Sequence, residues 1–254
     1  MSEQRNRVIR LCAISDTHDM AFTIPECDVC CHCGDWSPLE LQGNFEAMYE
    51  WLEAFVETLL NLPCRYVVLI AGNHDYIMES DVARNIFDEI QARCGGVRRY
   101  EDEHGVMHID KKIHYLDRSS VDLLGLKFWG SPVTKQVNRY CKYWAFETNV
   151  PSYDIPNDVD IILTHQPPEL NGLGNILWDV NDPSEPLGCN TLTKAVEQTH
   201  AKYHFCGHIH TGNHAASRYC NGTIGVNVSI LDDDYEVAYE PRIVNIETPR
   251  IPQG

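Results

Sequence analysis

The chain has 254 residues and a formal net charge of −17 at pH 7. This length suits one large α/β domain with a substantial buried core, and no linker-like stretch argues for two, so we expect a single domain over residues 1–254. The acidic balance disfavours a protein that grips duplex nucleic acid through its phosphates, because that binding depends on Lys and Arg.

The N-terminus and the cysteines predict a cytoplasmic protein. The segment from Met1 to Arg7 is not followed by the apolar region of a signal peptide, and no apolar stretch approaches the ~20 residues that span a membrane. Eleven cysteines, an odd number, favour reduced thiols over a disulfide framework. We therefore expect no membrane partner. The sequence contains no pattern that predicts an oligomeric state.

The first two predicted strands each end on residues that can bind metal. A strand from Val8 to Ser15 runs directly into Asp16 and His18, and a second strand, from Cys27 to His32, is followed by Asp35. Taken alone, an aspartate and a histidine after one strand are typical of a plain turn. Their meaning depends on the residues at the ends of the other strands.

Four cysteines around the second strand have a spacing that suggests a zinc site. Because successive side chains of a strand face opposite ways, Cys30 points away from Cys31 and Cys33. Cys27 lies ~20 Å from Cys33 at ~3.3 Å per residue, too far to share one ion. We therefore expect these thiols to be small buried hydrophobes. His32, on the same strand, is expected to be a hydrogen-bonded support of the metal site rather than a ligand.

The stretch from Val67 to Asp75 predicts the floor of an active site. Its first four residues form an apolar run typical of a covered strand. Gly72 ends the run and can adopt φ > 0, which directs Asn73, His74 and Asp75 to the crevice beyond the strand. Open α/β sheets bind their ligands at that carboxyl edge.

The remaining pattern alternates strands and helices, which indicates a layered α/β architecture. Helices are predicted over Leu39–Leu60, Val82–Cys94 and Asn190–Thr199. Strands are predicted over His108–Leu116, Val121–Leu124, Leu126–Trp129 with Gly125 in the turn before it, Asp160–Leu163 and Tyr203–Cys206, and a strand-rich tail, Thr223–Val244, completes the sheet.

Two of the later strands also end on histidines. His165 follows the strand Asp160–Leu163, and the proline pair after it keeps it in a loop. His208 and His210 lie just past Gly207, a spacing that suits neighbouring metal ligands on one segment. Five strand ends thus supply two aspartates, an asparagine and four histidines, enough for two divalent ions that share a bridge.

This series of motifs, D-x-H, G-D, G-N-H-D, H and G-H-x-H, resembles the calcineurin-like metallophosphoesterase superfamily from Asp16 to His210. Within it, the chain looks like the small metallophosphoesterase-domain-containing (UPF0046-like) group. It departs from that group at Gln166, where glycine is expected, and at Trp36, in place of phenylalanine. The resemblance implies an α/β fold of two facing mixed β-sheets flanked by helices, with the ions at the strand ends.

The resemblance also implies a role for each residue of the motifs. One ion would be held by Asp16, His18 and His210, the other by Asn73, His165 and His208, with Asp35 as the bridge and His74 unligated beside the substrate phosphate. Carboxylate, imidazole and amide ligands without thiolate suit two divalent ions. Mn²⁺ is favoured, with Fe, Zn²⁺ or Ni²⁺ as alternatives.

The mechanism expected from this resemblance is attack by a water shared between two ions ~3.5–4 Å apart. His74 would protonate the leaving oxygen or steady a phosphoryl oxygen. Asp75 is a candidate to orient His74, although a residue adjacent in sequence often points elsewhere. Asn73 and His74 are also expected to contact the substrate. Trp36, Tyr76 and the loop Gly172–Pro186 are candidates for the pocket wall, although each also has an interpretation as surface packing.

We expect a phosphodiesterase that acts on a cyclic nucleotide or a similar nucleotide-like diester. The alternatives are a phosphomonoesterase, nucleotidase or nuclease on the same scaffold, or a non-catalytic metal-binding interaction module. Relatives that dephosphorylate proteins carry an arginine soon after the Gly-Asp pair, whereas residues 36–39 here are Trp-Ser-Pro-Leu. Arg118, Arg139 and Arg218 are distant in sequence and remain able to fold into the pocket.

Overall fold

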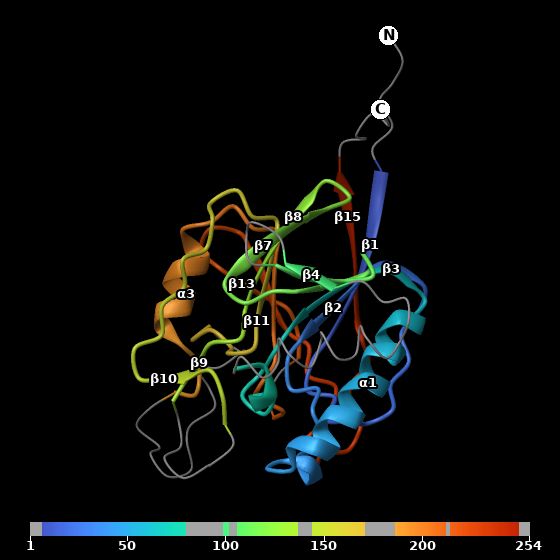
Figure 1. Cartoon of the computed structure of the whole chain (residues 1–254). Helices are drawn as coiled ribbons and strands as arrows, with labels where there is room; N and C mark the ends of the chain where they lie inside the picture. Colours follow the sequence, from blue (N-terminus) through green and yellow to red (C-terminus); the bar gives the residue numbers. More distant parts are fainter. Residues whose placement is uncertain are drawn as a thin grey trace.

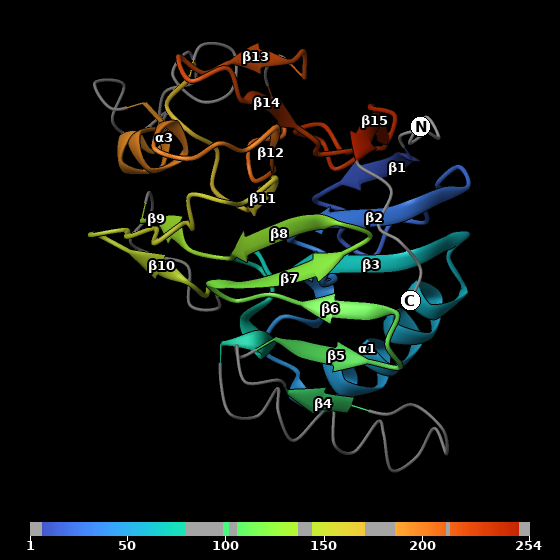
Figure 2. The same ribbon diagram turned by 90° about the horizontal axis from the view of Figure 1, so that it is seen from above.

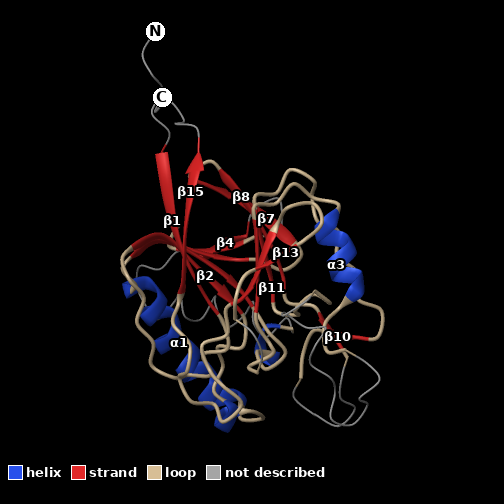
Figure 3. Ribbon diagram, turned by 180° about the vertical axis from the view of Figure 1, so that it is seen from behind, coloured by secondary structure: helices blue, strands red, loops and turns tan. Residues whose placement is uncertain are grey.

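A computed structural model describes residues 7–79, 99–101, 106–136, 144–170, 186–211 and 214–248. Two β-sheets pack against each other, and the two α-helices of the described residues lie on opposite outer sides of the strands (Figure 1, Figure 3). The predicted fold is confirmed: the chain is an α/β protein of two facing mixed β-sheets flanked by helices. None of the described helices combines the length and apolar character needed to cross a bilayer.

The first sheet has seven strands, and its centre is parallel. In spatial order they are β15 (Arg242–Thr248), β1 (Arg7–Ile14), β2 (Cys27–Cys33), β3 (Cys64–Ile70), β6 (Ile113–Tyr115), β5 (Met107–Ile109) and β4 (Arg99–Glu101). The pairs β1–β2, β2–β3 and β3–β6 are parallel. The carboxyl ends of β1, β2 and β3 therefore meet at one edge (Figure 2).

The second sheet has six strands and repeats this arrangement. Its order is β13 (Ser217–Arg218), β14 (Ile224–Asn227), β12 (Tyr203–Cys206), β11 (Ile161–Thr164), β8 (Leu126–Ser131) and β7 (Ser119–Leu123), with a separate pair of β9 (Thr134–Lys135) and β10 (Glu147–Thr148). Strands β8, β11, β12 and β14 run parallel. Backbone hydrogen bonds and contacts between the sheets bring the carboxyl ends of β11 and β12 to those of β1 and β2.

Within the described residues the helical segments are η1 (Leu39–Leu41), α1 (Phe45–Asn61), η2 (Tyr76–Met78) and α3 (Asn190–Glu197). The helix predicted from Leu39 begins later, at Phe45, because Gly43 has a φ of 88° and interrupts it. The side chain of Asn44 then caps α1 by accepting a hydrogen bond from the backbone N–H of Ala47 at 3.2 Å. The helix predicted over Val82–Cys94 lies outside the described residues.

Apolar side chains form three cores, one between the sheets, one under α1 and one under α3. The cysteines divide between two of them: Cys31 and Cys33 lie between the sheets, whereas Cys27 and Cys30 lie under α1 with Cys12. All five are buried and free. As the sequence predicted, they are small core residues, and Cys30 lies on the other side of β2 from Cys31 and Cys33.

Two strand predictions were wrong. The strand predicted over His108–Leu116 is a hairpin, because Asp110 and Lys111 have φ values of 49° and 57° and form a tight turn between β5 and β6. The tail predicted to complete one sheet divides between both. Its strand β14 extends the second sheet, while β15 pairs antiparallel with β1.

A buried chain of hydrogen bonds fixes His204 under α3. Thr164 donates its hydroxyl proton to the carbonyl of Gln166 at 2.6 Å, so its oxygen accepts the Nε2–H of His204 at 2.8 Å. The Nδ1 atom of His204 then accepts the hydroxyl proton of Tyr219 at 2.6 Å. Both ring nitrogens are thereby used by a neutral imidazole. Burial lowers the pKa of His204 to about 3.

We expect this histidine to destabilise the protein in acid. Its folded pKa lies below the unfolded value of ~6.5, so its contribution is fully present above pH ~6.5 and is lost as pH falls toward ~3, by up to about 1.4 kcal/mol per pH unit. The free energy of unfolding in urea, measured at several pH values in this range, should fall less steeply in His204→Gln, whose amide does not titrate. Equal slopes for the two proteins would contradict this assignment.

Candidate metal centre

The predicted metal-binding side chains and the predicted catalytic residue His74 all follow strands whose carboxyl ends meet. Asp16 and His18 follow β1, Asp35 follows β2, Asn73 and His74 follow β3, His165 follows β11, and His208 and His210 follow β12. The topology, and not the spacing in the sequence, brings these five segments together. They form two clusters that share one aspartate.

The first cluster contains Asp16, His18 and His210, whose ligand atoms all lie within 4.8 Å of one another. The Nε2 atom of His210 is 3.4 Å from Oδ1 of Asp16. The Nε2 atom of His18 is buried and has no hydrogen-bond partner among the described residues. A buried nitrogen without a partner is unfavourable in a folded protein, and a cation among these three residues would satisfy it.

The second cluster contains Asp35, His165 and His208, again with ligand atoms within 4.8 Å of one another. Asn73 adds an amide oxygen, because its Oδ1 lies 3.0 Å from Nε2 of His165. The Oδ2 atom of Asp35 is 3.1 Å from Nε2 of His165 and 3.9 Å from Nε2 of His18. One oxygen of Asp35 therefore faces both clusters, as a bridging ligand must.

Backbone carbonyls orient three of the histidines. The Nδ1 atom of His165 is 2.8 Å from the carbonyl oxygen of Cys33, that of His210 is 2.9 Å from Asp232, and that of His18 is 3.3 Å from Ser37. A carbonyl only accepts, so Nδ1 carries a proton and Nε2 is the nitrogen that faces the cluster. The ring orientation that metal binding requires is thus already present.

The protonation states of the buried residues in the centre favour the binding of cations. Burial opposes ionisation of both His165 and Asp35, but their mutual attraction outweighs it, raising the pKa of His165 to about 9 and holding the pKa of Asp35 well below its usual range. Burial and the charge of His165 lower the pKa of His208 to about 3. A divalent ion would replace the proton on His165 as the charge that balances Asp35. The donor set therefore fits two divalent ions.

Positive φ values at three residues, and a glycine at a fourth, allow the backbone to adopt this arrangement. Asp16, Asp35 and His208 have φ values of 54°, 53° and 71°, in the left-handed region that non-glycine residues rarely adopt. A Cβ atom on Gly207 would lie 2.3 Å from Oδ2 of Asp16. The missing side chain lets the backbone N–H of His208 reach both Asp16 oxygens at 3.0 Å.

Comparison with known proteins decides the family. The family model of the calcineurin-like phosphoesterases matches residues 9–212. The chain belongs to this family. It is 28% identical over 254 residues to human metallophosphoesterase domain-containing protein 1, covering 95% of this chain and 72% of that protein. It is also 28% identical over 256 residues to the Caenorhabditis elegans UPF0046 protein C25E10.12, covering 95% and 82%.

A solved structure supports the fold alone. The protein TT1561 of Thermus thermophilus is similar with a TM-score of 0.50 at 10% sequence identity, covering 87% of this chain and 89% of that chain. The family and the group predicted from the sequence are both confirmed by the relatives. A metal-dependent phosphoesterase is therefore the activity that the family supports.

Asp75 has a different role in this phosphoesterase from the one predicted. Its Oδ2 accepts the backbone N–H groups of Asp35 and Gly72 at 2.8 and 2.7 Å, and its Oδ1 accepts those of Trp36 and Ser37 at 3.1 and 2.9 Å. The carboxylate does not orient His74. It joins the loop after β2 to the loop after β3 and so places the candidate bridging residue. Burial and the charge of Asp35 raise the pKa of Asp75 to about 7.

We expect Asp75→Asn to lower both stability and metal binding. The asparagine amide group would face two of the four backbone donors, a loss of about 3 kcal/mol for unsatisfied buried groups. The midpoint of thermal unfolding and the metal content per chain would be measured against Asp154→Asn, which removes the same charge at an exposed position. Unchanged metal content in Asp75→Asn would show that the four hydrogen bonds do not place Asp35.

Trp36 does not line a pocket, and the prediction that it does was wrong. Its side chain is 0% exposed, stacks on Phe55 with ring centroids 5.0 Å apart, and donates its indole N–H to the carbonyl of Ile70 at 3.1 Å. The side chain of Tyr76 supports a loop: its hydroxyl accepts the backbone N–H of Gly43 at 3.1 Å. Residues 171–185, nearly all of the predicted loop Gly172–Pro186, lie outside the described residues.

His32 agrees with its predicted role. It is fully buried, and its Nε2 lies 3.1 Å from the hydroxyl oxygen of Thr17, the residue between Asp16 and His18. This contact supports the loop after β1. Burial lowers the pKa of His32 to about 3, so the imidazole is neutral and can bind Thr17 without adding charge to the centre.

Three residues that sequence reasoning missed surround the centre. The ring of Tyr235 lies 5.2 Å from that of His18 and 5.0 Å from that of His210. The ring of Trp144 lies 5.7 Å from that of His74, and the side-chain amide nitrogen of Gln42 lies 2.6 Å from its Nδ1. No motif marks these positions, because each is far in sequence from the histidine that it contacts.

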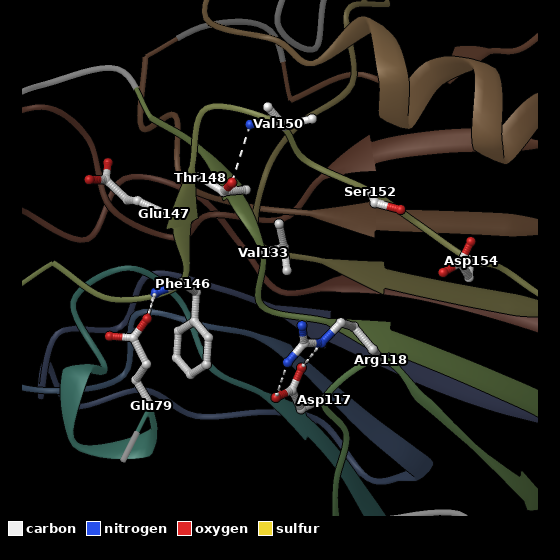
Figure 4. Close-up of a pocket in the computed structure, with 10 residues that line it drawn as sticks. All are labelled: Glu79, Asp117, Arg118, Val133, Phe146, Glu147, Thr148, Val150, Ser152 and Asp154. Carbon is white, nitrogen blue, oxygen red and sulfur yellow. Dashed lines mark hydrogen bonds and ion pairs between the residues drawn. The ribbon is translucent and has the colours of Figure 1, made fainter.

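A separate cavity of about 480 Å³ is lined in part by Arg118, one of the arginines named from the sequence (Figure 4). Arg118 makes two hydrogen bonds to the carboxylate of Asp117, at 2.9 and 3.2 Å, and Glu79 accepts the backbone N–H of Phe146 at 2.9 Å. None of the candidate metal ligands lines this cavity. Arg218 donates to the carbonyl of Gly222 at 2.9 Å, and Arg139 lies outside the described residues.

We expect Asp35→Asn to disable both metal positions, because one oxygen of Asp35 faces both clusters. His18→Ala should chiefly weaken the first position. Metal content, measured by elemental analysis after loading with Mn²⁺, should therefore fall further in Asp35→Asn than in His18→Ala. Two ions per chain and near-normal turnover in Asp35→Asn would defeat the dinuclear centre.

Proposed function

We propose that this protein is a dinuclear-metal phosphodiesterase that hydrolyses a nucleotide-like small diester, such as a cyclic nucleotide, in the cytoplasm. The observation that carries the proposal is the position of Asp35, whose Oδ2 lies between His18 and His165. A carboxylate shared by two ligand clusters is the feature that separates a two-metal hydrolase from a single-metal site. The complete ligand set also argues against a non-catalytic interaction module.

The residues that would hold the ions are Asp16, His18 and His210 for one, Asn73, His165 and His208 for the other, and Asp35 for both. Two bound divalent ions, for which we propose Mn²⁺, would supply an activated water as nucleophile and Lewis-acid stabilisation of the phosphoryl oxygens. The chain itself contributes the fixed positions of these side chains. It also contributes His74.

His74 is placed to assist the leaving group. Its backbone N–H donates to Oδ1 of Asp35 at 2.8 Å, which fixes the residue beside the candidate bridging carboxylate. Among the described residues its Nε2 has no hydrogen-bond partner, so this nitrogen is free for a substrate oxygen. We therefore assign His74 to catalysis and not to coordination.

The surroundings favour a diester over a monoester. A phosphate monoester is largely dianionic at neutral pH, and its recognition usually requires a guanidinium beside the metals. The two described arginines that were candidates for this role, Arg118 and Arg218, have other partners. The centre is instead bordered by the rings of Tyr235 and Trp144, which suit the organic groups of a singly charged diester.

The test compares kcat/KM for bis-p-nitrophenyl phosphate and p-nitrophenyl phosphate at one Mn²⁺ concentration and one pH. We expect the diester to be preferred, and Asp35→Asn, purified in the same way, to be inactive on both. A monoester preference of about tenfold, or ~1.4 kcal/mol in transition-state stabilisation, would reject the diesterase and favour a phosphomonoesterase on the same scaffold. Loss of all activity with two ions bound would favour a binding module.

A further inference from the structure

His74 has a protein contact on only one of its two ring nitrogens among the described residues. Its Nδ1 lies 2.6 Å from Nε2 of Gln42, which is part of the turn between η1 and α1. An amide nitrogen carries two hydrogens and no lone pair that accepts, so Gln42 donates and Nδ1 accepts. An imidazole that accepts at Nδ1 has no proton there. The one proton of the neutral ring then resides on Nε2.

We propose that Gln42 is a positioning residue that selects the Nε2–H tautomer of His74 and thereby makes His74 a hydrogen-bond donor to a substrate oxygen. The inference about the tautomer stands on this contact alone. Its consequence for catalysis rests on the phosphoesterase function proposed above. The two parts are tested by separate measurements.

The ring of His74 is also held in orientation. The ring of His18 lies 5.2 Å away at an interplanar angle of 79°, and the ring of Trp144 lies 5.7 Å away at 71°. Both contacts are edge-to-face arrangements, which restrain rotation of the imidazole. Together with the backbone hydrogen bond to Asp35, they hold Nε2 on the side away from Gln42. The selected tautomer therefore presents its N–H in a fixed direction.

Gln42 is held by the same segment that carries His74. The hydroxyl of Tyr76, two residues after His74, accepts the backbone N–H of Gly43 at 3.1 Å and donates to the carbonyl of Leu41 at 3.5 Å. The backbone N–H of Gln42 donates to the carbonyl of Leu39 at 3.2 Å. Tyr76 thus fixes the turn on both sides of Gln42, which gives this tyrosine a supporting role.

The identity of the partner on Nδ1 decides what His74 can do. A carboxylate there would accept a hydrogen bond from Nδ1–H, so the single proton of the neutral ring would reside on Nδ1 and Nε2 would have no hydrogen to donate. An amide donor there disfavours that ring, because two N–H groups would point at each other. With Gln42, a neutral His74 donates a hydrogen bond from Nε2, as neutral imidazoles do when they polarise a substrate oxygen. Gln42→Glu should therefore move the proton of His74 from Nε2 to Nδ1.

The first experiment reads the tautomer without any activity. Nitrogen NMR of the full-length protein labelled with ¹⁵N-histidine would be recorded without metal and with Zn²⁺, and the His74 signals would be assigned by their loss in His74→Asn. We expect the proton on Nε2 in the wild type, and on Nδ1 in Gln42→Glu. A wild-type His74 that carries its proton on Nδ1 overturns the proposal, whatever the activity of the enzyme.

The second experiment measures turnover. We expect Gln42→Glu to lower kcat on bis-p-nitrophenyl phosphate by ~10²-fold or more with little change in KM or metal content. Gln42→Ala should lose less, because it removes the donor without reversing the tautomer. The matched control is Gln198→Glu, the same change at the exposed C-cap residue of α3, which contacts no part of the centre. Equal losses of kcat in Gln42→Ala and Gln42→Glu would show that Gln42 has only a structural role.

A double-mutant cycle completes the test. In a His74→Ala background, Gln42→Glu should have no further effect on kcat, since its partner is gone. A full additional loss would show that Gln42 acts on something else. If Gln42→Glu does not fold, the wild-type tautomer and the Gln42→Ala variant still decide. An inactive protein with the expected tautomer would reject the phosphodiesterase and leave the tautomer assignment in place.

Discussion

Two buried carboxylates among histidines are the constraint on which this structure depends. Asp16 and Asp35 are almost fully buried, and no lysine or arginine forms an ion pair with either among the described residues. A buried anion is stable only with compensating charge or many hydrogen bonds. Here the compensation comes from imidazoles and backbone N–H groups, and a pair of divalent ions would supply it more completely. The same buried carboxylates thus determine both how the strand ends fold and how they bind metal.

Asp75 shows how the fold meets this constraint. By accepting four backbone N–H groups, it fixes the loops after β2 and β3 relative to each other and directs the Asp35 side chain toward both clusters. It does so while its own charge is repelled by Asp35. The strained φ values of Asp16, Asp35 and His208 belong to the same arrangement. Strain of this kind persists where surrounding contacts determine the backbone, and it gathers at sites that must be rigid before a ligand arrives.

Residues outside the predicted motifs border the centre. Tyr235 covers the rings of His18 and His210, Trp144 lies against His74, and Gln42 determines which nitrogen of His74 carries a proton. None of them supplies positive charge. The candidate ligands therefore bind cations strongly, whereas the residues that border them are neutral and mostly aromatic. This combination is the physical basis for expecting a small diester with organic substituents.

The sequence by itself determined the fold class, the family and the residues that gather at the centre. This was possible because each candidate ligand directly follows a strand, and apolar runs such as Val67–Ile70 mark the strands locally. The tertiary structure alone decided the rest. It turned Trp36 into a core residue, gave Asp75 its hydrogen bonds to the loop after β2, split the cysteines between two cores, and brought Gln42 to His74. Local patterns encode which residues lie at strand ends, whereas contacts between segments 30 or more residues apart depend on how the sheets and helices pack, which no spacing in the sequence records.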